Sequence, residues 1–258
     1  MLSPFLLAVS LLLPAARQDE DHRPPDPERV KSAVQDLREA FSKGDAAARI
    51  QAIEASSELL DPEVIAGIDK GLRDEDENVR AAAVTAFRTM DHPAALKALH
   101  QELERNKKLE LASDHVVSVI KAIGEHGSNE SVAVLTKDLF SYGDHKVITA
   151  RILALGNIRT TASVEALFDL MKLAGPRKVQ PYMSEFRLAL LVLTGADQGP
   201  SQELWVRWWN DHKKELTVLP EPPQLAKPDA RRWYAFWDRY PKEERQEKRG
   251  ERGGDGGK

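Results

Sequence analysis

Residues 61–94 read DPEVIAGIDKGLRDEDENVRAAAVTAFRTMDHPA, and this stretch decides the fold. It opens with one predicted helix start, Asp61-Pro62-Glu63, and closes with another, His92-Pro93-Ala94. Proline suits the first turn of a helix because its missing N–H has no partner there, and a preceding Asp can cap the free amides. A third start, Asp26-Pro27-Glu28, lies upstream, so the prolines are 35 and 31 residues apart. This period predicts helical hairpins stacked into a solenoid.

The same stretch contains a helix with a single apolar face. Its apolar residues follow the i, i+4, i+7, i+8, i+11 spacing of one helical stripe: Val79, Ala83, Ala86, Phe87 and Met90. The alanines in such stripes allow neighbouring helices to approach closely. Sustained alternation with β-branched residues is missing from the sequence, so we expect an all-α fold.

Five hairpins are predicted between residues 26 and 195. The first helices are expected at 27–42, 62–72, 93–105, 129–140 and 162–173, and the second helices at 45–60, 77–90, 112–125, 144–158 and 179–194. Two triplets, Ala122-Ile123-Gly124 and Ala154-Leu155-Gly156, lie 32 residues apart near the ends of successive second helices. Val132 and Val164 show the same offset in the first helices.

The segment Asp76-Glu77-Asn78-Val79-Arg80-Ala81-Ala82-Ala83 resembles HEAT repeats, including their bacterial HEAT-like branch. In that family an Asp and an Arg of the second helix form a side-chain ladder between repeats. The resemblance implies this role for Asp45, Arg49, Asp76 and Arg80, whereas Ser118 and Ile148 replace the base in later repeats. It covers about two-thirds of the chain and implies an all-α solenoid of about five hairpins, with a capping helix and a flexible C-terminal tail.

Residues 196–216 are predicted to form the capping helix. Leu193-Thr194-Gly195, Asp197, Gly199 and the tryptophans resemble the terminal segment of exported bacterial HEAT-like proteins. Three tryptophans share one face at i, i+3, i+4: Trp205, Trp208 and Trp209. If exposed, they would form an apolar patch of about 600 Å², near the upper limit for a monomer. We therefore expect them to be buried as a structural cap, and a ligand-binding role is the alternative.

Residues 1–16 are predicted to be a signal peptide. The run MLSPFLLAVSLLL is shorter than the roughly 20 apolar residues that span a membrane, and Pro14-Ala15-Ala16 follows it. We expect cleavage after Ala15 or Ala16, with an uncleaved anchor or a buried core helix as alternatives. The protein is then exported (periplasmic, envelope-associated or secreted), and the absence of cysteine is compatible with an oxidising compartment. A short charged linker is expected at 17–25.

The C-terminal part is predicted to contain a proline-rich connector and a short aromatic helix at 217–241, then a disordered charged tail at 242–258. Four aromatic residues of the helix follow i, i+3, i+4, i+7 spacing: Trp233, Phe236, Trp237 and Tyr240. This stripe either folds back along the solenoid or docks into a partner's groove.

A row of bases is expected on the second helices, which usually line the concave side of such solenoids: Arg49, Arg80, Lys121, Arg151 and Arg187. These bases could hold an acidic partner through bidentate contacts. The alternative is a structural Asp–Arg ladder or a solvated face.

The sequence favours a non-catalytic scaffold that binds a protein or peptide through the concave face or the aromatic tail helix. The competing hypothesis is a metal-dependent enzyme or metal-binding protein using Asp-His pairs at helix starts, chiefly Asp114-His115 and Asp144-His145, although Asp there also fits a helix cap. A purely structural tether is a third possibility.

No catalytic motif is present, so no cofactor and no enzymatic activity are expected. A net charge of -4, from 41 acids and 37 bases, argues against nucleic acid. No membrane span is expected apart from an uncleaved signal.

Overall fold

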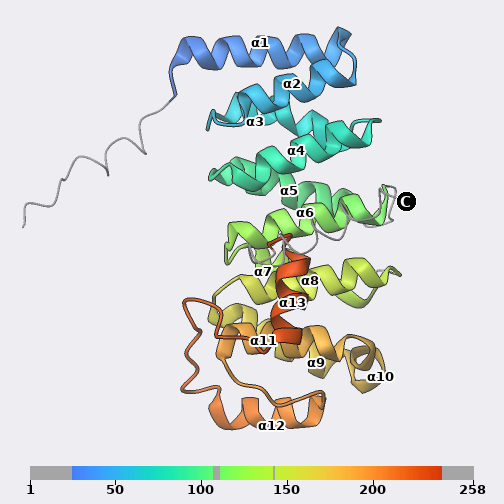
Figure 1. The fold of residues 1–258 in the computed structure, drawn as a ribbon, viewed down its shortest axis with the longest axis vertical. Helices are drawn as coiled ribbons and strands as arrows, with labels where there is room; N and C mark the ends of the chain where they lie inside the picture. Colours follow the sequence, from blue (N-terminus) through green and yellow to red (C-terminus); the bar gives the residue numbers. More distant parts are fainter. Residues whose placement is uncertain (1–24, 107–110, 142, 240–258) are drawn as a thin grey trace, which may run out of the picture.

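The computed structural model describes residues 25–106, 111–141 and 143–239, which form an all-α solenoid (Figure 1). The predicted fold class is confirmed, and no strand is found in these ranges. The predicted signal peptide at 1–16, the charged tail at 242–258 and Tyr240 lie outside the described residues.

The first three hairpins are six main helices, with one 3-10 turn, η2, after α3. Their bounds are α1 (Pro27–Lys43), α2 (Ala46–Ser56), α3 (Pro62–Asp69), η2 (Lys70–Arg73), α4 (Glu77–Thr89), α5 (Pro93–Arg105) and α6 (Ser113–His126).

The next two hairpins are less regular, and two further helices follow them. Their bounds are α7 (Ser131–Thr136), η3 (Leu139–Ser141), α8 (His145–Asn157), α9 (Thr161–Ala174), α10 (Pro176–Val179), η4 (Gln180–Tyr182), α11 (Met183–Thr194), α12 (Gln202–His212) and α13 (Lys227–Phe236).

The three proline-marked starts are capped as the sequence indicates. The side chain of Asp26 accepts from the amide of Glu28 at 3.0 Å, and that of Asp61 accepts from Glu63 at 2.8 Å. At the third start, Nδ1 of His92 accepts from the amide of Ala94 at 3.1 Å. Each cap satisfies an amide that the first helical turn leaves unpaired.

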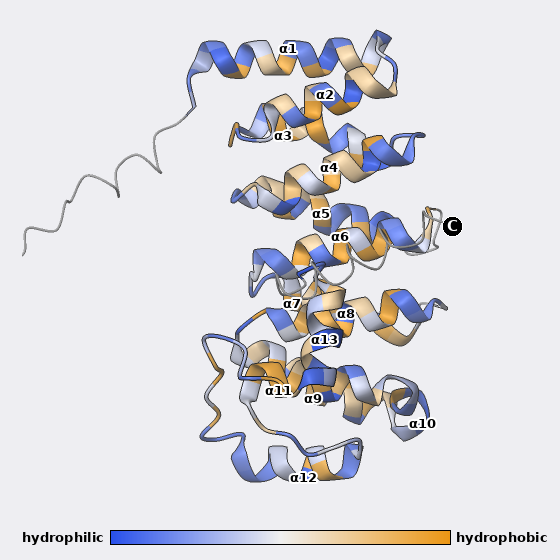
Figure 2. Cartoon of the chain, viewed as in Figure 1, coloured by the Kyte–Doolittle hydropathy of each residue, from blue (hydrophilic) through white to orange (hydrophobic). Residues whose placement is uncertain are grey.

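The helices form two layers. The second helices of the hairpins pack in the order α2, α4, α6, α8, α11, and the first helices pack in the order α1, α3, α5, with α7 and α9 continuing the row. The hydropathy colouring shows polar and apolar residues alternating along these helices, as expected when each has one buried face (Figure 2). We call the side of the second helices that points away from the first helices the second-helix face.

The helix α12 packs on α9 and so extends the layer of first helices. Trp205 and Trp209 are buried, and their rings lie 6.4 and 4.6 Å from the ring of Phe168. The indole N–H of Trp205 donates to the carbonyl of Gly199 at 2.9 Å. Trp208 is partly exposed and stacks on His212 at 4.9 Å. The exposed side of α12 therefore carries only part of the tryptophan surface.

The ladder implied by the HEAT resemblance forms with a different acid. Arg49 pairs with Asp74, at 3.0 Å between Nε and Oδ2, and the side chain of Asp76 instead accepts from the amides of Asn78 and Val79. Arg80 donates to the carbonyl of Asp74 at 2.7 Å. The inter-repeat contact thus uses the acid two residues earlier, whose Oδ1 also accepts from the amide of Asp76.

Candidate protein-binding face

The helix α13 lies across the second-helix face, in front of α8 and α11 and reaching α6 (Figure 1). Trp233 and Trp237 are buried against the solenoid, with 3% and 2% of their surface exposed. Of the two arrangements left open by the sequence, the structure therefore shows the aromatic helix folded back. Phe236 is half-buried, and its ring lies 5.2 Å from Nζ of Lys121.

Two glycines make room for the indoles. A Cβ on Gly124 would lie 2.8 Å from the Trp237 ring and 3.1 Å from Cα of Ala154. A Cβ on Gly156 would lie 2.8 Å from Cα of Ala189 and 3.4 Å from the ring of Trp233. These glycines end the two triplets that recur 32 residues apart, so the recurrence marks close helix approach and a floor for the aromatic side chains.

Two of the predicted bases are already paired with acids near or on α13. Nζ of Lys121 lies 2.9 Å from Oδ2 of Asp238. The guanidinium of Arg187 lies 2.9 Å from Asp229 and also pairs with Asp197. The row of bases thus binds, in part, this chain's own tail.

Beside these pairs the charges are reversed, with the bases on or just after α13 and the acids on the solenoid. Arg232 of α13 pairs with Glu185 of α11, and Arg239 lies 2.9 Å from Glu125 of α6. Glu125 also accepts a bidentate contact from Arg88 of α4. Alternating charges on both surfaces fix the direction in which α13 lies.

The ion pair between Arg187 and Asp197 persists at neutral pH. Hydrogen bonds to Asp197 and then Asp229 raise the pKa of Arg187 above its ordinary value. The same Arg187 contact lowers the pKa of Asp197. Because the folded-state pKa of Asp197 is depressed, its stabilising contribution is present above the unfolded value near 3.8 and is lost as the pH falls below it.

Arg151 is buried inside the scaffold, in contrast to the sequence-based expectation of a base exposed for binding. Its side chain is buried, with 1% exposed, and its Nη2 donates to the carbonyls of Val134 at 2.6 Å and Lys137 at 2.9 Å. These carbonyls lie at the end of the short helix α7, where intrahelical donors run out. Arg151 therefore stabilises a helix end, and Arg80 likewise binds backbone carbonyls.

The acids of the Asp-His pairs act within the scaffold. Asp144 accepts from the amide of Val147 at 3.1 Å and from the hydroxyl of Ser113, and this second contact is the main reason that its pKa is lowered. Asp114 pairs with Lys146 at 2.9 Å. Both contacts link α8 to the preceding repeat.

The two imidazoles point into different surroundings. Nε2 of His115 lies 3.7 Å from the buried carboxylate of Glu102, whereas His145 is exposed and packs on Tyr182 at 4.8 Å. Within residues 25–106, 111–141 and 143–239, no group of three or more His, Cys, Asp or Glu side chains is placed to hold a metal ion. The structure thus gives the metal-site hypothesis no support.

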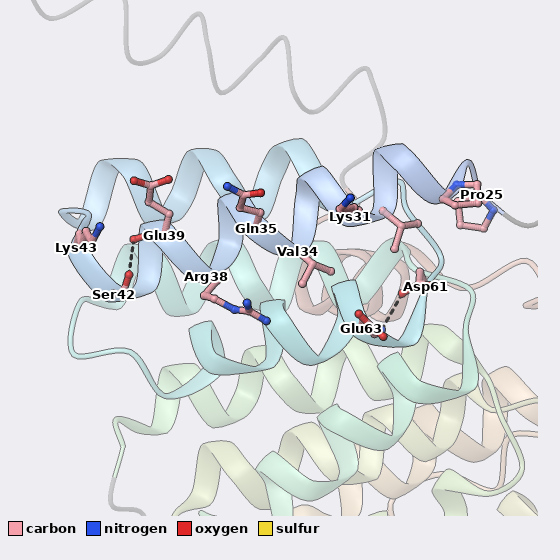
Figure 3. Close-up of a pocket in the computed structure, with 12 residues that line it drawn as sticks. Pro25, Lys31, Val34, Gln35, Arg38, Glu39, Ser42, Lys43, Asp61 and Glu63 are labelled. Carbon is pink, nitrogen blue, oxygen red and sulfur yellow. Dashed lines mark hydrogen bonds between the residues drawn. The ribbon is translucent and has the colours of Figure 1, made fainter.

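A groove of about 1060 Å³ runs along α1 and reaches the start of α3. Figure 3 shows its lining side chains spread along the helix instead of converging on one point. Its bases are Lys31, Arg38 and Lys43, and its acids are Glu39, Asp61 and Glu63. Equal numbers of both charges, spread in this way, form an ordinary polar helix surface.

A second groove, of about 400 Å³, lies between α2 and α4 on the second-helix face. Its lining residues are small, polar or aliphatic: Ile50, Glu54, Ser57, Asn78, Ala81, Ala82, Thr85, Ala86 and Thr89. The helix α13 extends over α6, α8 and α11, so α13 leaves this N-terminal part of the face uncovered (Figure 1).

Sequence reasoning missed the acids that receive α13. Glu125 and Glu185 lie on second helices, and their side chains are only 8% and 5% exposed. The sequence did contain one sign of these acids, namely the base Arg232 directly before Trp233 in the tail helix. A buried acid needs a counter-charge, and this base could supply it.

Comparison with known proteins agrees with this architecture. Residues 34–110 match the family model for HEAT repeats, a range from within α1 to just beyond α5. No curated protein matches the chain. No helix in the part of the chain that the structure describes is long and apolar enough to cross a bilayer. Residues 34–110 are therefore similar to HEAT repeats, and the stack of helical hairpins continues beyond this matched segment.

Proposed function

We propose that the protein is a non-catalytic scaffold that binds a protein or peptide partner through its second-helix face. The position of α13 is the observation that supports this proposal. The second-helix face already binds this helix through two buried indoles and through the ion pairs around them. HEAT repeats generally serve as protein-interaction scaffolds. The open groove between α2 and α4 extends the same face and offers further area for a partner.

Site-specific photo-crosslinking tests this proposal. A photo-reactive residue at Thr85, which is exposed in the open groove, is expected to give one discrete crosslinked product in the native host. The matched control is Lys97, an exposed residue of α5 in the other layer. Equal labelling at both positions, or none at Thr85, would argue against binding by the second-helix face.

We propose that the scaffold acts after export. The support is the apolar run before Pro14-Ala15-Ala16, together with a chain free of cysteine. The mature protein isolated from its host is expected to begin at Ala16 or Arg17, as measured by N-terminal sequencing or intact mass. An N-terminus at Met1 in the membrane fraction would indicate the uncleaved anchor, and Met1 in the cytoplasm would refute export.

We also propose that α12 caps the solenoid. A repeat array exposes the apolar side of its last hairpin unless another element covers it. Trp205 and Trp209 supply this cover by packing on Phe168 of α9.

A further inference from the structure

We propose that the surface under α13 is a binding site for an amphipathic helix of a partner protein, and that α13 is a tethered competitor for it. We call this surface the α13 seat; its floor is Gly124 and Gly156, and its rim is Lys121, Glu125, Glu185 and Arg187. The proposal rests on the proposed scaffold function and names the site and the chemistry of the partner.

The helix α13 is short and lies outside the two layers of the repeat array. It has ten residues, and its N-cap, Ala226, makes no side-chain capping bond. Isolated helices shorter than about 12–15 residues are marginal in water. The helical form of α13 therefore depends on contact with the seat, as it would for any short helix that folds on binding.

The tether that precedes α13 is short and anchored. The amide of Leu219 donates to the carbonyl of Leu193 at 2.8 Å, and Arg159 donates to the carbonyl of Leu219 at 2.9 Å. Only residues 220–226 separate this anchor from α13, and three of them are Pro220, Pro222 and Pro223. A stiff tether keeps the helix at high local concentration, so a partner must compete with it.

The contacts divide into anchors and orienting charges. Trp233 and Trp237 enter the floor, whereas Asp238, Arg239 and Arg232 remain 65%, 61% and 42% exposed at the rim. Exposed ion pairs add little affinity, but they fix register and direction. The indole N–H of Trp237 is buried and has no acceptor among the described residues.

The seat specifies the chemistry of that helix. The bound helix needs two large aromatic side chains four residues apart, which pack on Gly156 and Gly124. An acid near the first turn of the helix pairs with Arg187, and a base beside its first aromatic residue pairs with Glu185. After the second aromatic residue, an acid pairs with Lys121 and the base that follows it pairs with Glu125. Because these charges alternate along the seat, a helix in the reverse direction would place like charges together.

The test uses a labelled synthetic peptide with the sequence of residues 226–239, AKPDARRWYAFWDR, and full-length protein. Fluorescence anisotropy is measured with the wild type and with the released-tail variant Trp233→Ala/Trp237→Ala. The released-tail variant is expected to bind the peptide at least about tenfold more tightly than the wild type, because the tethered competitor is removed. A peptide with alanine at both tryptophan positions serves as the control and is expected not to bind.

A charge swap locates the binding site. Lys121→Glu in the released-tail background is expected to weaken binding, and a peptide carrying Asp238→Lys is expected to restore it. A second released-tail variant, Asp229→Lys/Asp238→Lys, keeps both indoles and serves if the first does not fold, as judged by circular dichroism.

Three results would overturn the proposal. The first is that the peptide does not bind a folded released-tail variant. The second is that it binds the wild type and the released-tail variant equally well. The third is that the charge swap does not change its affinity. A concentration-dependent wild-type dimer that the peptide disperses would assign the seat to α13 of a second copy instead. A negative result in this peptide-binding test would not change the crosslink expected at Thr85. It is therefore distinguishable from failure of the proposed scaffold function.

Discussion

Replacing Trp205 with alanine is expected to lower the free energy of unfolding by about 3–5 kcal/mol, the usual range for a fully buried large aromatic residue. Trp205 has no exposed surface, packs near Phe168 and donates to the carbonyl of Gly199. Its loss leaves a cavity beneath α12 and an unpaired carbonyl, and it uncovers the last hairpin. Urea unfolding followed by far-UV circular dichroism measures the change.

Trp208→Ala is the matched control, because it removes the same side chain from the same helix. Trp208 is partly exposed and stacks on the exposed His212. Its ring also lies 6.2 Å from that of Phe168, so its replacement is expected to lower the free energy of unfolding, but by less than Trp205→Ala, because only part of its surface is buried. Equal losses from the two variants would show that burial against α9 is not what stabilises this end of the solenoid.

Gly156→Leu is expected to destabilise the protein by about 3 kcal/mol, at the upper end for overpacking a core. Even a Cβ at this position would lie 2.8 Å from Cα of Ala189, and a backbone atom cannot rotate away. The helices α8 and α11 must therefore separate, and the leucine atoms beyond the Cβ are expected to displace the Trp233 ring, which lies 3.4 Å from that Cβ position. Thermal unfolding measures the first effect, and tryptic cleavage at Arg231 or Arg232 reports the second.

Gly143→Leu controls for the added side chain. Gly143 is exposed, and a Cβ there would meet no heavy atom of the described residues beyond its chain neighbours within 4 Å. This variant is expected to unfold within about 0.5 kcal/mol of the wild type. Comparable destabilisation by both substitutions would mean that close packing between α8 and α11 does not require a glycine.

Residue spacing predicted most of the fold. The helices α1, α3 and α5 begin at the predicted prolines because a proline in the first turn and a cap before it are local features. The all-α solenoid follows from the repeat period, since each hairpin can bury its apolar stripe only against a neighbour.

Spacing alone did not predict which bases are accessible. Arg151 lies on a second helix, as predicted, yet its guanidinium caps α7 because that helix ends after six residues and leaves carbonyls that need donors. The inter-repeat ladder also uses Asp74 in place of the expected Asp76, whose side chain caps α4. Both outcomes depend on loop and helix-end geometry that a repeat alignment does not contain.

The sequence by itself determined the proline-marked helix starts, the pairing of the helices and their order of stacking, because these depend on apolar periodicity and on caps a few residues away. Only the tertiary structure decided that the aromatic tail helix lies on the second-helix face. Lys121 and Asp238 are 117 residues apart in the chain, and no periodic pattern connects them. Their contact depends on where the whole stack and its proline-rich connector place two surfaces with complementary shape and charge.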